Sequence, residues 1–405
     1  MKLRLDRWKK RPKAAEDMPQ NDYYESLSAR LGIFQVILYL SLLAFVVLSV
    51  IGNAGMITYR NFYYFFKDLN ASVESVDVLS TDSVTYQTAK EQSFTLYRKG
   101  LAVAGNRSVT AFTATGRQTL SQTINYKNPV AVGTGRYLLV YELGGTQYSL
   151  YNSYTQIHEG KSEYPIYGAC VSDAGMYALI SRSEQYTSTV SLYSSNFSLL
   201  NRYNKSGYVM DVAIHEKGTL LAILTSSPRD GFFETAISLH MPKSGEMGTT
   251  VPISDSVGLS CSFTDGKRIS VLCTDSLVHL NEKGETTDTY SFAGREPICA
   301  RLTEYGTVMA LKGASIDEKN HVLVFDKSGK IVYNELVGDA VRELDRTEDS
   351  VIWLTSSGLT CLDLTSKGLD YYPCDTDEKR LLAVTGHEAM LCSPQKAEYI
   401  RFFQS

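Results

Sequence analysis

Residues 169–180 read Ala-Cys-Val-Ser-Asp-Ala-Gly-Met-Tyr-Ala-Leu-Ile: an apolar run, a short polar turn with a glycine, and a second apolar run. Glycine readily adopts the positive φ that a tight hairpin turn needs, so this stretch predicts two antiparallel strands. The same pattern recurs on both sides of it, with a weaker copy lacking the glycine in the last of these ranges: residues 131–140, 212–223, 260–271, 299–310 and 341–352.

A second pattern lies between successive copies of the first. It is an apolar strand, a turn rich in Asp, Asn, Lys, Ser and Gly, and another strand; it is clearest at residues 322–333, close at 277–288 and 359–370, and looser at 190–199 and 109–118. Each unit therefore holds four short strands in two hairpins, with a period of about 36–48 residues, which is typical of β-propeller blades. Two tandem β-sandwiches could share this strand content but would not explain the regular period.

The predicted fold is all-β, a propeller of four-stranded blades with eight blades favoured. A count of seven stays open if one weak unit is an irregular insertion. The last unit has only three strands, at residues 380–385, 389–392 and 397–403. We expect a fourth from residues 71–86, for example 73–79, because pairing strands from both ends of the domain removes an exposed sheet edge. The innermost strands are expected to start near Phe94, Val130, Ile166, Met210, Leu259, Ile298, Val341 and Leu381.

The turn at residues 171–175, Val-Ser-Asp-Ala-Gly, resembles the turn that recurs in WD40-like and quinoprotein-like propellers. Together with a basic N-terminal segment and one long apolar stretch, the repeats resemble an uncharacterised family of membrane-anchored β-propellers from Gram-positive bacteria that carries only a domain-of-unknown-function label. The resemblance covers most of the chain and includes no catalytic motif. It implies a fold and a location, and no activity.

The long apolar stretch, residues 31–59, carries no charged side chain. It is long enough to cross a bilayer as one helix, so we predict a transmembrane helix over residues 31–58. Lys and Arg are retained on the cytoplasmic side, which predicts a single-pass protein of the cell membrane with a cytoplasmic tail (1–30) and an extracellular propeller (71–405). The basic residues before the stretch are Lys2, Arg4, Arg7, Lys9, Lys10, Arg11, Lys13 and Arg30.

Two alternatives concern this region. A cleaved signal peptide is the rival of the anchor, because Gly52, Asn53 and Ala54 offer small residues for cleavage, although the preceding basic region is long for a signal peptide. Residues 59–70 are rich in aromatic side chains, which settle at the depth of lipid headgroups, so we predict an interfacial linker and lipid contact over residues 31–66. Packing of these aromatic side chains beneath the outer domain is equally compatible with the pattern.

Composition restricts the chemistry. The net charge is −4 and the tail is basic, so the outer domain is acidic and lacks the basic patch that a nucleic-acid partner would require. Trp8 and Trp353 are the only tryptophans, whereas a quinone-binding propeller would be expected to carry one in most blades. The pairs His215-Glu216 and His387-Glu388 lack the second histidine of a zinc motif. We expect no cofactor, no metal site and no catalytic residue.

Seven cysteines are present, an odd number, so at least one must stay free or pair outside the chain. Most lie in apolar strand-like runs and are expected to be buried thiols. Cys361 and Cys374 flank one hairpin and are the pair to test for a disulfide.

One group of carboxylates could form a site. Asp173, Glu216, Asp265 and Glu304 occupy the first turn of successive units, and Glu348 and Asp349 occupy that turn in the weaker copy. Propeller geometry would bring these turns to one face near the axis, where a ring of carboxylates could attract a cation or a basic segment of a partner. Acidic residues in short turns also serve simply to satisfy local backbone donors, which is the more ordinary explanation.

These observations support two functions of different class. The first is a membrane-tethered, non-enzymatic binding or scaffolding module for an envelope protein, peptide or wall polymer. The alternative is a hydrolase or lyase that acts on envelope glycan or peptide through the axial carboxylates. A sensor that relays binding through the helix is a third, weaker hypothesis, because the short tail would need a cytoplasmic partner.

Overall fold

A computed structural model describes residues 22–52, 83–242, 248–266, 268–313, 319–375 and 380–403. The chain divides into two compact units, Met1–Lys67 and Asp68–Ser405, and each is described by itself. The predicted linker at residues 59–70 and most of the predicted tail, residues 1–21, lie outside the described residues.

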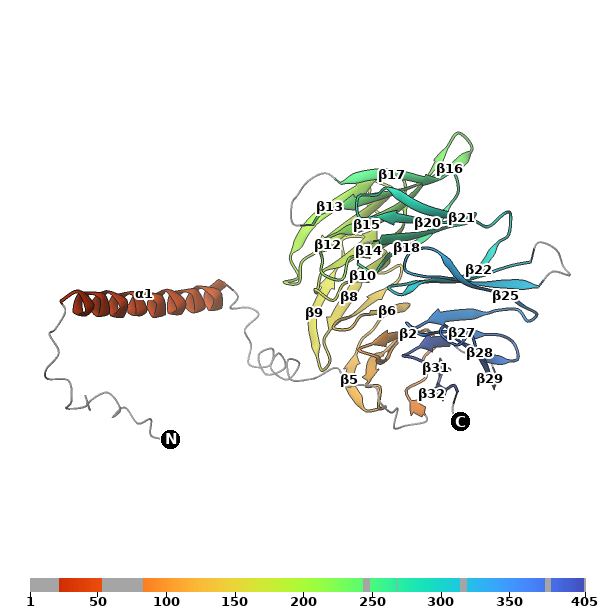
Figure 1. Ribbon diagram of the computed structural model, residues 1–405, viewed down its shortest axis with the longest axis horizontal. Coiled ribbons are helices and arrows are strands. Elements are labelled where there is room, and N and C mark those ends of the chain that lie inside the picture. Colours follow the sequence, from red (N-terminus) through yellow and green to blue (C-terminus); the bar gives the residue numbers. More distant parts are fainter. Residues whose placement is uncertain are drawn as a thin grey trace. The chain divides into compact units, whose positions relative to one another are not determined.

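The first unit contains one long helix, α1 (Asp22–Gly52) (Figure 1). The helix begins before the predicted residue 31 and ends before the predicted residue 58. The side chains described within it, those of residues 30–45 and 47, are all exposed. No helix within the described residues meets the length and hydropathy that a membrane crossing requires, so the predicted transmembrane helix is not confirmed.

The second unit is a β-propeller of eight four-stranded sheets, which confirms the favoured blade count. Blade 1 consists of β2 (Gln92–Tyr97), β3 (Gly100–Gly105), β4 (Ser108–Phe112) and β5 (Gln118–Thr123); blade 2 of β6 (Pro129–Gly133), β7 (Leu138–Glu142), β8 (Gln147–Tyr151) and β9 (Gln156–Lys161). Blade 3 consists of β10 (Ile166–Val171), β11 (Tyr177–Ser181), β12 (Ser188–Tyr193) and β13 (Leu199–Lys205); blade 4 of β14 (Tyr208–Ile214), β15 (Leu221–Arg229), β16 (Phe232–His240) and β17 (Thr249–Ser254).

Blade 5 consists of β18 (Gly258–Thr264), β19 (Arg268–Cys273), β20 (Ser276–Asn281) and β21 (Thr286–Ser291); blade 6 of β22 (Pro297–Thr303), β23 (Gly306–Leu311), β24 (Asn320–Phe325) and β25 (Ile331–Val337). Blade 7 consists of β26 (Glu343–Arg346), β27 (Ser350–Leu354), β28 (Gly358–Asp363) and β29 (Leu369–Pro373); blade 8 of β30 (Arg380–Ala383), β31 (Glu388–Cys392), β32 (Lys396–Arg401) and β1 (Ser83–Thr85). All pairings within the eight sheets are antiparallel. They join strands that follow one another in the chain, except that β1 pairs with β32. The innermost strands start within two residues of the predicted positions.

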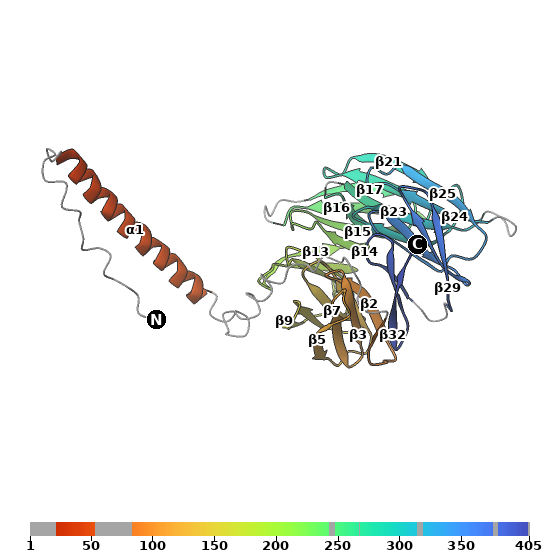
Figure 2. The ribbon, with the colours of Figure 1, turned by 60° about the horizontal axis from the view of Figure 1, so that its bottom comes forward.

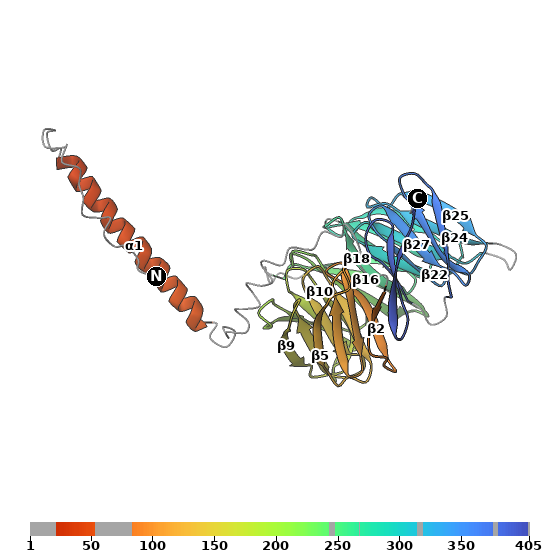
Figure 3. The same cartoon turned by 90° about the horizontal axis from the view of Figure 1, so that it is seen from below.

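The ring is closed by strands from both ends of the domain. β1 lies within the range predicted for the closing strand, residues 71–86, whereas the example 73–79 lies outside the described residues. Val84 of β1 is buried, and the Tyr86 hydroxyl donates a hydrogen bond to the Ser393 carbonyl oxygen at 2.6 Å. The orange start of the propeller and its blue end lie side by side in Figure 2 and in Figure 3. The pairing covers the outer edge of β32, which would otherwise be open to another chain.

The core is divided among the interfaces between blades, and one hydrophobic cluster fills each of the eight interfaces. The two middle strands of a blade supply both clusters that the blade contacts, so they are buried on both faces and read as continuous apolar runs. Between blades 2 and 3, for example, the Tyr148 and Tyr177 rings pack with centroids 5.7 Å apart. This mutual burial explains why the apolar repeat was readable in the sequence.

Side chains also join neighbouring inner strands across the blade boundaries. In each case a side-chain oxygen of one blade accepts a hydrogen bond from a backbone N–H of the next, and the pairs are Ser93 with Ala131 (3.0 Å), Thr95 with Gly133 (3.2 Å), Asp211 with Cys261 (2.9 Å) and Asp345 with Ala383 (2.9 Å). These contacts hold the inner strands around the axis.

All seven cysteines are thiols, so the disulfide between Cys361 and Cys374 considered above does not form. Cys361 packs in the cluster between blades 7 and 8, and burial raises the pKa of its thiol to about 12. A thiol buried in this way acts as a small apolar side chain.

Candidate functional site

A cavity of about 1090 Å³ lies on the propeller axis and is lined by residues from all eight blades. Most of its lining comes from the ends of the innermost strands and from the turn that follows each one, which we call the rim turns. We call the side of the ring where the rim turns lie the rim end, and the opposite side, where the innermost strands begin, the entry end. A concave, axial position of this kind is a common place for ligand sites.

The four carboxylates singled out in the sequence all line this cavity. Asp173, Glu216, Asp265 and Glu304 lie in the rim turns of blades 3, 4, 5 and 6. Backbone hydrogen bonds tie these turns together in pairs: the Ala174 N–H donates to the Glu216 carbonyl oxygen at 3.0 Å, and the Asp265 N–H donates to the Glu304 carbonyl oxygen at 3.2 Å. The structure thus places all four at one end of one cavity.

Blade 7 continues the series, because Glu348 and Asp349 of its rim turn also line the cavity. We call these six carboxylates the acidic rim. Among the described residues, no three acidic, histidine or cysteine side chains converge closely enough to hold a metal ion. The acidic rim is therefore a charged surface spread over five blades.

Some charges of the acidic rim are partly balanced. Arg268 lies 3.7 Å from Asp265, and Lys327 lies 3.7 Å from Glu348. Asp173 differs, because its Oδ1 atom is buried and has no hydrogen-bond partner among the described residues. A carboxylate oxygen in that position can still accept a hydrogen bond from a bound group.

The opposite side of the rim end is basic. Arg98 and Lys99 form the rim turn of blade 1 and line the same cavity. Both have a positive φ, 52° and 61°, which is the conformation of a two-residue hairpin turn and is uncommon for long side chains. The rim end is thus polarised across the axis, acidic in blades 3 to 7 and basic in blade 1.

A buried pair of charged residues, not predicted from the sequence, lies beneath the rim in blade 7. Arg346 donates hydrogen bonds to the carbonyl oxygens of Phe325 and Thr347, and burial lowers the pKa of its guanidinium to about 10. Asp345 accepts hydrogen bonds from the backbone N–H groups of Arg346 and Ala383, and burial raises the pKa of its carboxyl. Both side chains are occupied by the backbone, so they support the site rather than face a ligand.

The entry end carries a second feature that the sequence analysis missed. The pairing of the innermost strand with its neighbour shifts by one residue in blades 3, 4, 5 and 6, so each strand has a β-bulge at an equivalent place. A bulge leaves one residue outside the regular pairing and re-aims its side chain. The bulged residues form what we call the bulge arc, and they are large, apolar and partly exposed: Tyr167 (50%), Met210 (37%), Leu259 (38%) and Ile298 (41%).

The bulge arc is confined to one half of the ring. In blades 1, 2, 7 and 8 the innermost strand pairs with its neighbour without a shift. Blades 3 to 6 therefore carry both a bulged apolar residue at the entry end and a carboxylate at the rim end. The sequence carries a weak signal, since it predicts strand starts near Met210, Leu259 and Ile298, but a bulge depends on the register between strands.

A long hairpin extends the entry end of blade 4. Tyr208, the first residue of β14, pairs with Ser226, so residues 227–234 of β15 and β16 run on past the start of the innermost strand. Figure 1 shows this hairpin projecting beyond the neighbouring sheets. Phe232 near its tip is 72% exposed, and Arg229 and Glu234 form an ion pair at 2.9 Å between its two strands.

Comparison with known proteins identifies the family. Residues 71–402 match a family described as a family of unknown function (DUF5711), and the chain belongs to this family. No curated protein sequence matches the chain significantly.

Solved structures share the propeller fold at low sequence identity. Sqt1 from Chaetomium thermophilum, bound to the N-terminus of the ribosomal protein L10, is 12% identical with a TM-score of 0.54, over 79% of this chain and 99% of that chain. BamB from Moraxella catarrhalis is 12% identical with a TM-score of 0.53, over 80% and 98%. The dihydro-heme d1 dehydrogenase NirN, in complex with DHE, is 12% identical with a TM-score of 0.50, over 72% and 67%. At this identity the likeness extends to the fold alone.

Proposed function

We propose that this protein is a binding module whose axial cavity receives a segment of a protein partner, and that the segment carries large apolar side chains followed by basic ones. One observation carries the proposal: blades 3 to 6 each present an exposed apolar residue in the innermost strand at the entry end and a carboxylate in the rim turn that follows this strand. A segment lying along these strands would bury the bulge arc and neutralise the acidic rim.

The energetics favour such a segment. Covering a partly exposed apolar side chain contributes about 25 cal/mol for each Å² removed from water. Carboxylates gathered at a cavity mouth raise the local concentration of cationic groups and speed their association. Neither the burial of apolar surface nor the electrostatic attraction requires the protein to form or break a covalent bond. The Sqt1 structure, in which a propeller holds the N-terminus of another protein, supports the idea that this fold can bind a peptide segment.

The peptide preference can be tested by selecting from a random-peptide library with the purified full chain. Peptides that combine Arg or Lys with Leu, Ile, Met or aromatic residues should be enriched. A variant with Asp173→Asn, Glu216→Gln, Asp265→Asn and Glu304→Gln should lose the preference for basic residues and keep the preference for apolar ones. Selection of the same basic peptides by both proteins would overturn the role of the acidic rim.

The proposed location is the cell membrane, with the N-terminus in the cytoplasm and the propeller outside, where an envelope protein would be the partner. The support is the uncharged run over residues 31–52, whose described side chains point outward from α1 without cover; Ile33, Phe34 and Phe45 are more than 60% exposed. Such a surface is unfavourable in water and favourable in lipid.

Membrane retention of the full chain tests the tether. The wild-type chain should stay in the membrane pellet after an alkaline carbonate wash, and an external protease should digest the propeller in intact cells. The double variant Leu38→Arg with Leu42→Arg should move to the soluble fraction, because two charges near the middle of an apolar helix strongly oppose insertion. Unchanged fractionation of that variant would contradict the tether.

A further inference from the structure

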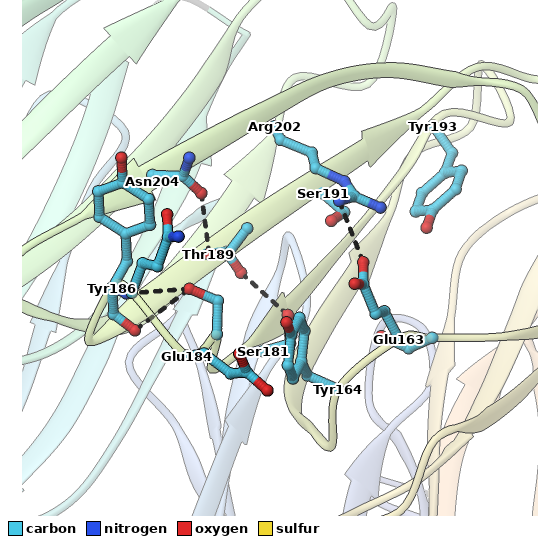
Figure 4. Close-up of a pocket in the computed structure, with 13 residues that line it drawn as sticks. Glu163, Tyr164, Ser181, Glu184, Tyr186, Thr189, Ser191, Tyr193, Arg202 and Asn204 are labelled. Atoms are coloured by element: carbon cyan, nitrogen blue, oxygen red, sulfur yellow. Dashed lines mark hydrogen bonds and ion pairs between the residues drawn. The ribbon is translucent and has the colours of Figure 1, made fainter.

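A second cavity, about 280 Å³, lies between blades 2 and 3, away from the axis (Figure 4). One wall is the segment that leaves blade 2 at residues 162–164, and the other is the face of blade 3 formed by β11, β12 and β13. We call it the interblade cleft. Its volume is near the lower end for small-molecule sites.

The interblade cleft is open because a tyrosine that fills the neighbouring interface is displaced here. Between blades 1 and 2, Tyr126 of the connecting segment is only 3% exposed, and its hydroxyl lies 2.7 Å from Ser149 Oγ. Ser191 in β12 of blade 3 is the equivalent of Ser149 in β8 of blade 2. Each pairs with the third residue of the preceding strand, Leu179 for Ser191 and Val140 for Ser149. Tyr164 is the tyrosine of the segment between blades 2 and 3, and it stays half-buried at the cleft wall.

This difference leaves Ser191 without a partner. It is 9% exposed, and no hydrogen bond to its hydroxyl is formed within the described residues, whereas the equivalent Ser149 is satisfied by Tyr126. Ser191 lines the cleft, so its hydroxyl can still donate a hydrogen bond to a bound ligand and accept one from it. The position therefore points to a ligand with hydroxyl groups.

Other polar groups converge on the same space. Figure 4 shows Ser181, Thr189 and Asn204 in sequence across the face of blade 3. Thr189 Oγ1 donates to Asn204 Oδ1 at 2.9 Å, which occupies the amide oxygen and leaves the amide N–H groups to donate into the cleft. The face thus offers both donors and acceptors at short spacing.

The charge of the interblade cleft is close to balanced. Arg202 Nη1 donates to Glu163 Oε2 at 3.2 Å on one side, and Glu184 is the remaining charged residue of the lining. An anionic ligand would find its one cation already paired, and a strongly basic ligand would find few carboxylates. Tyr164, Tyr186 and Tyr193 supply aromatic surface around the polar floor.

We propose that the interblade cleft binds a neutral carbohydrate of one or two sugar units. A sugar ring presents hydroxyl groups that donate and accept around its edge and a C–H face that packs on aromatic rings, which is the combination the cleft supplies. The site is separate from the axial cavity and does not depend on the proposed protein partner. A polar peptide is the competing ligand class.

Titration of the purified full chain with a panel of neutral di- and tetrasaccharides, built from glucose, galactose or N-acetylglucosamine, tests the proposal. At least one should bind with saturation by isothermal calorimetry, and Asn204→Ala should weaken that binding about tenfold or more. Asn201→Ala is the matched control, because Asn201 lies on the same strand but faces the other side and should leave affinity unchanged. Thermal unfolding of both variants reports whether the fold is kept.

If Asn204→Ala fails to fold, Tyr186→Ala in the exposed loop between β11 and β12 serves instead and should also reduce affinity. The proposal is overturned if no saccharide of the panel binds, or if Asn204→Ala and Tyr186→Ala bind as tightly as Asn201→Ala. Binding of Ser- and Asn-rich peptides in place of saccharides, lost in the same variants, would also overturn it in favour of a peptide site.

Discussion

Asp211, in the innermost strand of blade 4, joins that strand to the innermost strand of blade 5. Its carboxyl accepts hydrogen bonds from the Val212 N–H at 2.8 Å and from the Cys261 N–H of blade 5 at 2.9 Å. Burial nevertheless raises the pKa of this carboxyl to about 6, because the loss of water outweighs the two hydrogen bonds. Asp211 directly follows the bulged residue Met210, so the buried carboxyl and the exposed apolar side chain are neighbours in the same strand.

This pKa gives Asp211 a defined pH dependence. The folded state binds the proton more tightly than the unfolded state, so Asp211 favours folding below about pH 4 and loses that contribution as the pH rises to about 6. Relative to Asp211→Asn, which cannot ionise, the wild-type chain should lose on the order of 1–3 kcal/mol of unfolding free energy between pH 4 and pH 7. Denaturant unfolding of both proteins at the two pH values measures the difference.

A constant difference in unfolding free energy at both pH values would mean that Asp211 is ionised alike in the folded and unfolded states. Comparison of the two proteins under the same conditions removes the effects of all other titrating groups. The expected sign, a wild-type chain that is relatively less stable at pH 7, is opposite to that of a salt-bridged surface carboxylate.

At the residue scale, the sequence predicted some of the candidate site and missed the rest. Asp173 and Glu304 could be placed at the rim because each occupies the same turn of a repeating unit, and the repeat fixes where that turn lies. Ser191 and Tyr164 could not be recognised, because the interblade cleft exists only where a side chain fails to fill the gap between blades. Such a gap depends on packing between segments, which no local pattern reports.

At the scale of elements, β1 is the shortest strand and yet closes the ring. Its three residues pair with β32, and Val84 is the one buried residue among them; it packs in the cluster between blades 8 and 1. This short strand therefore covers the outer edge of blade 8 and contributes Val84 to the interface between blades 8 and 1.

Val84→Asp should destabilise the propeller by roughly 3 kcal/mol or more, because it places an unpaired carboxylate in an apolar cluster. Thr85→Asp is the control on the adjacent, exposed position and should change the unfolding free energy by no more than about 0.5 kcal/mol. Denaturant unfolding of the two variants tests this, and light scattering should reveal association through the uncovered edge of β32 in the Val84 variant only. Equal effects of both substitutions would argue that β1 does not close the ring.

The four bulges are a feature of the strands that the local sequence pattern could not predict. Strand number and order followed from the period of apolar runs, because each blade must bury both faces against its neighbours. A bulge is set by the register of two strands, and moving the register by one residue exchanges the faces of a strand. The sequence alone could therefore place Leu259 and Ile298 at strand starts without indicating that both are unpaired and exposed.

At the scale of the whole propeller, the ring is regular in fold and irregular in surface. All eight blades share one topology, yet the bulge arc is restricted to blades 3 to 6, the acidic rim to blades 3 to 7, and the basic turn to blade 1. Blades 3 to 6 thus form one side of the ring that is suited to apolar groups at the entry end and to basic groups at the rim end. We expect a partner segment to lie against that side and not to fill the cavity symmetrically.

Photo-crosslinking in cells tests this central claim most directly. A photoreactive amino acid at Leu259 of the full chain should trap a protein partner, whereas the same group at Ile331, which is similarly exposed (43%) on the outer strand of blade 6, should not. Asp265→Asn combined with Glu304→Gln should reduce the adduct formed at position 259. An adduct at position 331 but not at position 259, or one that does not respond to the changes in the acidic rim, would contradict the account.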